Sequence, residues 1–442
     1  MRLVISIIIL LTPLEGDAAM WSESLDSLKS LNSPNACIAE GRRSPLICRD
    51  PVRAVCRGRE SSHRATNASL IKALKSQSKT ISDGFQKWMS ERESYQKTPG
   101  APVTEAYRAA YRNHLENLGK VNDRVLAEYK LSRKDLERIS IQANAAVAEA
   151  VQSFLGSDQT SIKREMLDHL KKARLLTPGD ISLGDPRNNV GLNCGSDGLK
   201  ASAFYVHDEP GPGVFLCPGF LLLSLEQADG DIGSLVGVLA HEIGHAIDGR
   251  SLPVLQPSGQ IFRKDDYKTI YQPYWNCMSN LVKREGSKFI SLGETMEYYS
   301  KNLPSLERSS KKNPDRSFEL NEIIKMAKLY QHQASAFSVD PMSSELLKSE
   351  LIADSYMGAA LERVARDLDR PRREAFIVKN LKLLCIGPTP EGFPKKVEVL
   401  DPDHPPLEYR VEQTLMQPSV RALLGCPAVD AERRPCSLME SE

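Results

Sequence analysis

The chain has almost no charge imbalance and no long apolar run beyond its N-terminus. Among its 442 residues, 58 basic and 57 acidic side chains give a formal net charge of +1, and no long basic run is present. We therefore expect no nucleic-acid partner. Because no segment after the N-terminus is long enough to cross a bilayer, we also expect no stable membrane insertion. The hydrophobic content of 41% is that of an ordinary globular protein.

The sequence also lacks any Cys-x-x-Cys pair, although it contains nine cysteines. Zinc sites built from cysteine usually contain such pairs, so these cysteines are not interpreted as zinc ligands. In an exported protein they are expected to form disulfides instead. The sequence leaves their connectivity open, and the odd number leaves at least one thiol free or paired between chains.

The first 18 residues have the pattern of a secretory signal peptide. Met1 and Arg2 form a short positive start, residues 3–14 are mostly apolar, and the small residues at 16–18 suit a signal peptidase. We therefore expect a cleavable signal peptide over residues 1–18 and a secreted or periplasmic location. An uncleaved membrane anchor is the alternative interpretation.

The composition changes near Pro178, and this change divides the rest of the chain into two expected regions. Residues 19–177 begin with an irregular segment that contains cysteines and continue as a helical N-terminal region. Residues 178–442 are expected to form a second domain. In the first region, apolar residues at three- and four-residue spacing among helix formers predict several helices. These helices are expected over residues 70–90, 105–129, 133–155 and 158–175.

Two short apolar runs near the start of the second region predict a small sheet. Residues 201–206 and 214–217 flank a turn rich in Gly and Pro, residues 208–213, which is typical of a hairpin. The exposed edge of such a sheet can pair with an extended peptide. Together with the helices, this hairpin predicts an α+β fold that is predominantly helical.

The most informative stretch is His-Glu-Ile-Gly-His, residues 241–245. Residues four apart lie on one face of a helix, so His241 and His245 can bind one metal ion together. Glu242 lies beside them and can act on a water molecule that the metal activates. This pattern is the signature of zinc hydrolases, which are usually peptidases. The alternative is a pair of buried histidines with hydrogen-bonded rings.

The surroundings of the motif favour the metal interpretation. Residues 231–250 are expected to form one buried helix, with Asp231 as its cap and Gly249 at its end. Buried histidines and a buried glutamate need partners, because an unpaired buried charge is costly. A zinc ion would be such a partner.

A catalytic zinc ion needs a third protein ligand and one open position. The best third ligand is Glu350, in the segment Glu-Leu-Ile-Ala-Asp of a helix expected over residues 344–367. Asp354 lies one turn further along on the same face. A metal-bound histidine normally donates its other ring proton to such a group, so Asp354 is expected to hold one of the two histidines. The alternative is a solvated acidic pair on the helix surface.

These motifs resemble those of the Glu-ligand zinc metallopeptidases (gluzincins), in particular the catalytic domain of the neprilysin and endothelin-converting-enzyme family. His245-Ala-Ile-Asp248 is similar to the continuation of the first motif in that family, which suggests Asp248 as a supporting group. Residues 400–411, Leu-Asp-Pro-Asp-His-Pro-Pro-Leu-Glu-Tyr-Arg-Val, resemble its Asp-x-His-x-Pro element and the Arg-Val that follows.

The resemblance implies a zincin-type catalytic domain over residues 178–442, with a small sheet, two zinc-bearing helices and one zinc ion per chain. It implies that His404 stabilises the oxyanion and that Arg410 contacts a substrate carbonyl. Residues 202–204, Ser-Ala-Phe, correspond to the strand motif Asn-Ala-Tyr or Asn-Ala-Phe of the family. The shared Ala203 is therefore a candidate substrate contact, and Ser202 is a departure from the motif.

The motifs are also similar to those of the prenyl-protein (CAAX) and heat-shock membrane endopeptidases, since His404-Pro-Pro-Leu-Glu-Tyr-Arg410 matches their late His-Pro-Pro and Arg. Those enzymes are mostly embedded in membranes, so the neprilysin branch is favoured. This chain departs from that branch at Ser349, where the family has Gly. The interval between the two zinc motifs is also long, which suggests an insertion near residues 285–340.

We therefore expect an exported zinc endopeptidase that hydrolyses a peptide or protein substrate, with Glu242 as general base. One alternative is a catalytically inactive binding protein that keeps the zincin fold. Another is a membrane-associated relative of the CAAX and heat-shock proteases. A purely structural zinc site is disfavoured, because such sites are usually four-coordinate and contain cysteine.

Overall fold

The computed structural model is mostly helical and contains one small sheet, which confirms the predicted α+β class. The expected signal peptide, residues 1–18, lies outside the described residues. Within the described part, no helix combines the length and the apolar character that a membrane span requires. The structure describes residues 46–56, 80–92, 103–155, 160–181, 183, 193–195, 198, 202–206, 212–248, 264–286, 289–312, 324, 327–328, 331, 340–385, 404–428 and 436–438.

The N-terminal region consists of helices whose starts carry capping residues. α6 (Glu105–Glu128) begins after Thr104, whose hydroxyl accepts a hydrogen bond from the Tyr107 N–H at 3.1 Å. α7 (Arg133–Phe154) begins with a reciprocal capping box at Ser132. Both helices follow their predicted boundaries to within one residue. Other described helices of this region are α2 (Leu46–Arg49), α3 (Pro51–Cys56), residues 80–92 and α8 (Thr160–Lys172), and the 3-10 helix η2 (Pro178–Asp180) begins the second region.

The sheet has three strands in the order β1-β3-β2. β2 (Ala203–Val206) pairs antiparallel with β3 (Gly213–Leu216), which confirms the predicted hairpin. β1 (Arg174–Leu175) pairs parallel with β3, so the helix predicted to continue through residue 175 is too long. Residues 174–176 bond to the sheet instead of continuing the helix: the Leu176 N–H, for example, donates to the Val214 carbonyl at 2.8 Å. In the described part of the chain, β2 is an edge strand.

The helix that carries the His-Glu-x-x-His motif starts as predicted but ends early. Asp231 caps the start by accepting a hydrogen bond from the Gly233 N–H at 3.0 Å. The 3-10 helix η3 (Ile232–Leu235) forms the first turn, and α11 (Val236–Gly244) follows it.

The end of α11 lies at Gly244, and Gly249, the predicted end, lies outside the described residues. After Gly244 the backbone N–H groups of residues 245–247 bond to carbonyls three residues back, at 3.2, 2.9 and 3.0 Å, instead of four. This tighter winding ends the α-helix. It also turns Asp248 back toward His245.

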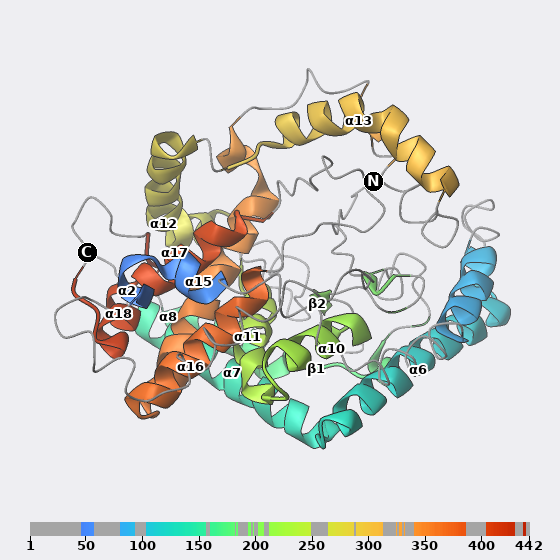
Figure 1. Cartoon of the computed structure of the whole chain (residues 1–442), viewed down its shortest axis with the longest axis horizontal. Helices are drawn as coiled ribbons and strands as arrows, with labels where there is room; N and C mark the ends of the chain where they lie inside the picture. Colours follow the sequence, from blue (N-terminus) through green and yellow to red (C-terminus); the bar gives the residue numbers. More distant parts are fainter. Residues whose placement is uncertain are drawn as a thin grey trace, which may run out of the picture.

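α15 (Glu345–Arg366) follows the predicted range 344–367 closely, with Ser344 and Asp367 as its caps. The Ser344 hydroxyl accepts a hydrogen bond from the Leu347 N–H at 3.2 Å. α15 packs against α11 and α7, and Figure 1 shows α11 and α15 in the interior of the molecule. Further helices are α10 (Pro218–Gln227), α12 (Lys264–Arg284), α13 (Leu292–Lys312), η8 (Pro341–Ser343), α16 (Arg370–Lys382), η9 (Leu383–Cys385), α17 (Leu407–Met416) and α18 (Pro418–Leu424).

One hydrophobic core includes buried residues from both sides of the domain boundary predicted at 178. Residues of α6 and α7 pack into the same core as α11 and α15, so the N-terminal helices support the second region directly. The division into two domains stays a prediction. α13 differs from these helices: it lies along the top of the view in Figure 1 and belongs to a separate small cluster that includes Leu303 and Leu306.

Disulfides are present, as the sequence predicts. Cys48 pairs with Cys426 across 378 residues, and Cys277 pairs with Cys436 across 159 residues. These two bonds tie α2 and α12 to the C-terminal part of the chain. A further disulfide joins Cys194 to Cys217, which directly follows β3.

Candidate metal centre

Three side chains from two helical segments converge on one point. His241 lies in α11, His245 directly follows this helix, and Glu350 lies in α15. Each offers one ligand atom, and the three atoms lie within 4.8 Å of one another. Glu350 Oε2 is 3.1 Å from His241 Nε2, and its Oε1 is 3.5 Å from His245 Nε2. This group can hold a metal ion, as the sequence predicts.

The spacing and the donor types fit a small divalent ion. Two ligands of a tetrahedral ion with bonds of roughly 2.0–2.1 Å lie roughly 3.4 Å apart. The separations of 3.1 and 3.5 Å, which involve different oxygens of Glu350, are close to this value. Glu350 Oε2 is buried, and although the Nε2 atoms of His241 and His404 each lie 3.1 Å from it, no described group makes a well-aligned hydrogen bond to it. A buried carboxylate oxygen without a donor is costly, and a cation shared with the imidazoles would remove that cost.

Close packing of the two helices brings the ligands together. A Cβ atom built on Gly244 would lie 3.1 Å from Ala353 Cα and 3.4 Å from Tyr356 Cβ. Such distances are shorter than ordinary contacts between carbon atoms. The glycine inside the His-Glu-x-x-His motif therefore permits α11 and α15 to approach almost backbone to backbone, next to the ligands.

A buried ion pair holds the ring of His241. Its Nδ1 lies 2.9 Å from Asp354 Oδ1. The Nε of Arg410, in α17, lies 2.9 Å from each oxygen of Asp354, and the Nη2 donates to Oδ1 at 2.6 Å. All three side chains are buried. When the carboxylate accepts a hydrogen bond from the Nδ1–H group, the lone pair of Nε2 is left free for a metal ion.

A different pair of residues holds the ring of His245. Its Nδ1 lies 3.0 Å from Asp248 Oδ2, and the Ser349 hydroxyl donates to the same oxygen. The Ser349 Oγ also lies 3.3 Å from His245 Nδ1. Asp248 is on the turn after α11, whereas Ser349 is on α15 and directly precedes the ligand Glu350. The contact of Asp248 with His245 thus lies where the resemblance suggests a supporting group.

The electrostatics favour a cation at this site. Burial alone would raise the pKa of Glu350, but the neighbouring His404, His245 and His241 lower that pKa well below its usual range. Burial would lower the pKa of His245, yet Glu350 and Asp248 raise it well above its usual value. The same balance raises the pKa of His241, with Asp354 and Glu350 outweighing burial. The carboxylates thus stabilise positive charge on the imidazoles, and a metal ion would take the place of those protons.

The other predicted site residues lie on several elements, and two of them, His404 and Arg410, lie beside the metal-centre residues. Glu242 is buried in α11. His404 Nε2 lies 3.1 Å from Glu350 Oε2, and its side chain is 36% exposed. Ala203 lies in the edge strand β2, paired with Leu216 of β3. Arg410 is occupied with Asp354, and its contact with a substrate carbonyl stays a prediction, as do the roles of His404 and Ala203.

No protein-family model, curated protein or solved structure matches this chain. The resemblance to the neprilysin family, and the second resemblance to the CAAX and heat-shock endopeptidases, therefore stay predictions that rest on the quoted motifs. Sequence reasoning did not predict the contact of Ser349 with Asp248. The available signal was the departure from Gly at that position, but the sequence does not show which residue the serine hydroxyl faces.

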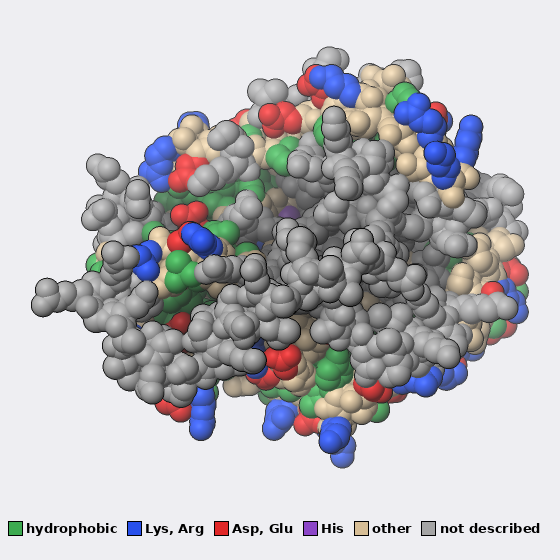
Figure 2. All heavy atoms as spheres, viewed as in Figure 1, with side chains coloured by type: hydrophobic (Ala, Val, Ile, Leu, Met, Phe, Trp, Pro, Cys, Tyr) green, Lys and Arg blue, Asp and Glu red, His purple; other side chains and the backbone are tan. Residues whose placement is uncertain are grey.

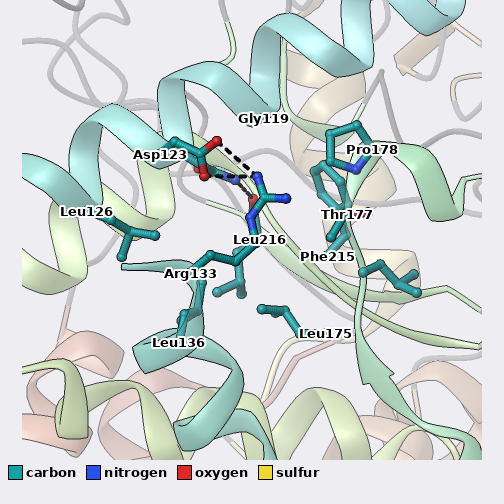
Figure 3. A pocket seen from close by; sticks show the side chains of 12 residues that line it. Gly119, Asp123, Leu126, Arg133, Leu136, Leu175, Thr177, Pro178, Phe215 and Leu216 are labelled. Carbon is teal, nitrogen blue, oxygen red and sulfur yellow. Dashed lines mark hydrogen bonds and ion pairs between the residues drawn. The ribbon is translucent and has the colours of Figure 1, made fainter. Parts of the chain in front are cut away.

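A small patch of a histidine side chain is visible on the displayed face of the molecule (Figure 2). A cavity elsewhere, between α6, the start of α7 and the sheet, is lined by the ion pair of Asp123 and Arg133 and by apolar residues such as Phe215 (Figure 3). Its volume of about 30 Å³ is room for very few water molecules.

Proposed function

We propose that this chain is a zinc metalloendopeptidase whose residues 178–442 form a zincin-type domain. The observation that carries the proposal is the convergence of His241, His245 and Glu350 on one point. Two imidazoles and one carboxylate are the ligand set of many catalytic zinc sites, which leave a fourth position open. The absence of cysteine from this group argues against a structural zinc site.

The residues of the chain have distinct roles in the proposed hydrolysis. When bound, zinc supplies Lewis acidity, which activates water and polarises a carbonyl group near neutral pH. Glu242 takes the proton of the attacking water and passes it to the leaving amine. His404, beside Glu350, donates a hydrogen bond to the oxyanion, and such donors contribute about 3 kcal/mol.

A peptide substrate suits the edge of the sheet. β2 packs against α11 and is an edge strand of the described sheet. An extended peptide that pairs with this edge gains backbone hydrogen bonds without any requirement for a particular sequence. Ala203 would then supply one of the backbone groups that bind the substrate.

The disulfides support an exported enzyme. Disulfides form and persist in oxidising compartments and are rare in reducing ones. The bonds Cys48–Cys426 and Cys277–Cys436 both involve the C-terminal segments near α17, which carries Arg410. Secretion or export to a periplasm, directed by residues 1–18, is therefore part of the proposal.

The proposal is tested by measuring metal content and casein cleavage together, with and without a chelator. The wild-type chain is expected to hold one zinc ion and to lose cleavage on chelation. Glu242→Gln is expected to keep its zinc and to lower kcat by about 100- to 10,000-fold, because only the base is removed. Glu345→Gln, an exposed glutamate at the start of α15, is the matched control and should leave both unchanged.

Each contrary result has a definite meaning. Normal turnover by Glu242→Gln would exclude the proposed base. Full activity of the metal-free chain would exclude zinc chemistry. A zinc-loaded wild-type chain that cleaves no peptide or protein would favour the alternative of a binding protein with a zincin fold.

A further inference from the structure

Ser349 makes a contact that serines within helices rarely make. A serine inside a helix usually bonds to a carbonyl of its own helix. Ser355 on α15 and Ser224 on α10 do so, at 3.0 Å from the Leu351 carbonyl and 2.8 Å from the Phe220 carbonyl. The Ser349 hydroxyl instead crosses to Asp248, on the turn that follows α11. The hydroxyl therefore joins the two segments that bear the metal ligands.

The two groups that meet on Asp248 share one oxygen atom. The Ser349 hydroxyl and the His245 Nδ1 both contact Oδ2, and the side chains of Ser349 and Asp248 are buried. A hydroxyl that donates to this oxygen restricts the rotation of the carboxylate. The carboxylate in turn fixes which ring nitrogen of His245 carries the proton and how the ring is oriented.

The position of Ser349 adds a second constraint. It directly precedes Glu350, so the hydrogen bond from Ser349 fixes the rotation of this part of α15 relative to His245. Glu350 Oε1 lies 3.5 Å from His245 Nε2. Ser349 therefore affects the Nδ1 side of the imidazole through Asp248 and the Nε2 side through Glu350. The backbones of the two helices nearly touch at Gly244, and a small rotation of either would separate the ligand atoms.

We propose that Ser349 is a positioning residue that acts through Asp248 to hold His245 and Glu350 in the geometry that binds the metal ion. This inference rests on the proposed metal site but not on peptide hydrolysis. Ser349 is not one of the three residues that can hold the ion. Its contribution is to the affinity of the folded, metal-free chain for zinc.

The experiment is a double-mutant cycle on zinc affinity, measured by competition with a chromophoric chelator on the full-length, disulfide-bonded chain. Loss of a group that orients a metal ligand typically weakens metal binding by about 10- to 100-fold, and we expect this loss in Ser349→Ala. In an Asp248→Ala background, the same substitution should have less than about a twofold effect, because the oxygen that accepts its hydrogen bond is gone.

Three further variants separate positioning from general stability. Ser349→Thr keeps the hydroxyl and should restore most of the affinity. Ser349→Cys keeps the volume but is a weak donor, so it should lose at least about fivefold, and it carries the test if the alanine variant does not fold. Ser224→Ala removes a buried serine hydroxyl that bonds within its own helix, and it should bind zinc like the wild type.

The outcomes distinguish this inference from the proposed function. Wild-type affinity in both Ser349→Ala and Ser349→Cys, or an equal loss in both backgrounds, overturns the positioning role. A wild-type chain that binds zinc and cleaves nothing overturns the peptidase proposal alone. A wild-type chain that binds no divalent ion overturns both.

Discussion

The two histidines of the metal centre are supported in different ways. His241 contacts Asp354, whose negative charge is balanced by Arg410 from α17. His245 contacts Asp248, which accepts a hydrogen bond from a neutral hydroxyl on α15. The first support is a buried ion pair that brings in a third helix, whereas the second is a short link between the two helical segments that bear the ligands.

This difference separates stability from fine positioning. Breaking a buried ion pair leaves an uncompensated charge and destabilises the whole fold. Removing a hydroxyl from a hydrogen bond costs less and mainly frees the geometry of its partner. We therefore expect changes on the His241 side to lower folding stability strongly, and changes on the His245 side to act mostly on metal affinity.

The largest expected effect comes from the ligands themselves. His241→Ala and His245→Ala should each abolish stoichiometric zinc binding, because both imidazoles bind the same ion and a catalytic site has only three protein ligands. Zinc content after dialysis, measured by atomic spectroscopy, checks this. If one of the two variants kept a full zinc ion, the two histidines would not share a site. His169→Ala, which removes a histidine in α8, is the control and should keep the zinc.

The next effect tests the ion pair on the His241 side. Arg410→Ala should lower the free energy of unfolding by about 3–5 kcal/mol, since Asp354 would stay buried without its cation. Arg410→Lys should lose less, because the charge is kept while the paired hydrogen bonds are not. Urea unfolding of the metal-free chain gives these values. Arg366→Ala, at an exposed ion pair on α15, should change stability by at most about 1 kcal/mol. If Arg410→Ala and Arg366→Ala lowered the free energy of unfolding by similar amounts, the stabilising role of the buried ion pair would be wrong.

A smaller effect on folding stability is expected at Gly244, where α11 and α15 approach each other closely. Gly244→Ala should cost about 1–3 kcal/mol and weaken zinc binding, because the new methyl group would meet Ala353 Cα at 3.1 Å. Gly358→Ala on α15 is the matched control, since its added atom would meet Thr414 only at 3.6 Å. That variant should be neutral or stabilising by up to about 1 kcal/mol. Equal effects of the two substitutions on zinc affinity would show that the close approach does not set the site.

The smallest effect on the metal site is expected from the separate cluster of α13. Leu306→Ala removes a buried side chain there and should destabilise its surroundings by about 2–5 kcal/mol. Zinc affinity should stay within about twofold of the wild type, because this cluster is not part of the core that holds α11 and α15. A tenfold loss, measured by chelator competition, would show that α13 is coupled to the centre.

The sequence predicted those parts of the site that depend on local spacing. The four-residue interval in the His-Glu-x-x-His motif places both histidines on one face, and the capped helix at 344–367 places Glu350 and Asp354 together. The partners of the supporting carboxylates depend on how α15 and α17 rotate against α11, which local patterns do not encode. The same limit applies to the shared core, since a composition change at Pro178 does not show which helices pack together.

The 3-10 winding at the end of α11 is a further case. A run of apolar residues with a glycine at 249 favours a longer helix, and only the tertiary contacts of the buried Asp248 show why the winding changes before it. Local propensity is commonly overridden in this way at functional sites.

The most direct test of the metal centre is an anomalous difference map, recorded at the zinc edge, of crystals of the wild-type chain loaded with one equivalent of zinc. The account predicts a single peak within about 2.0–2.2 Å of the Nε2 atoms of His241 and His245 and of a Glu350 oxygen. A peak bound by other residues, or one that lacks Glu350 as a ligand, would contradict it.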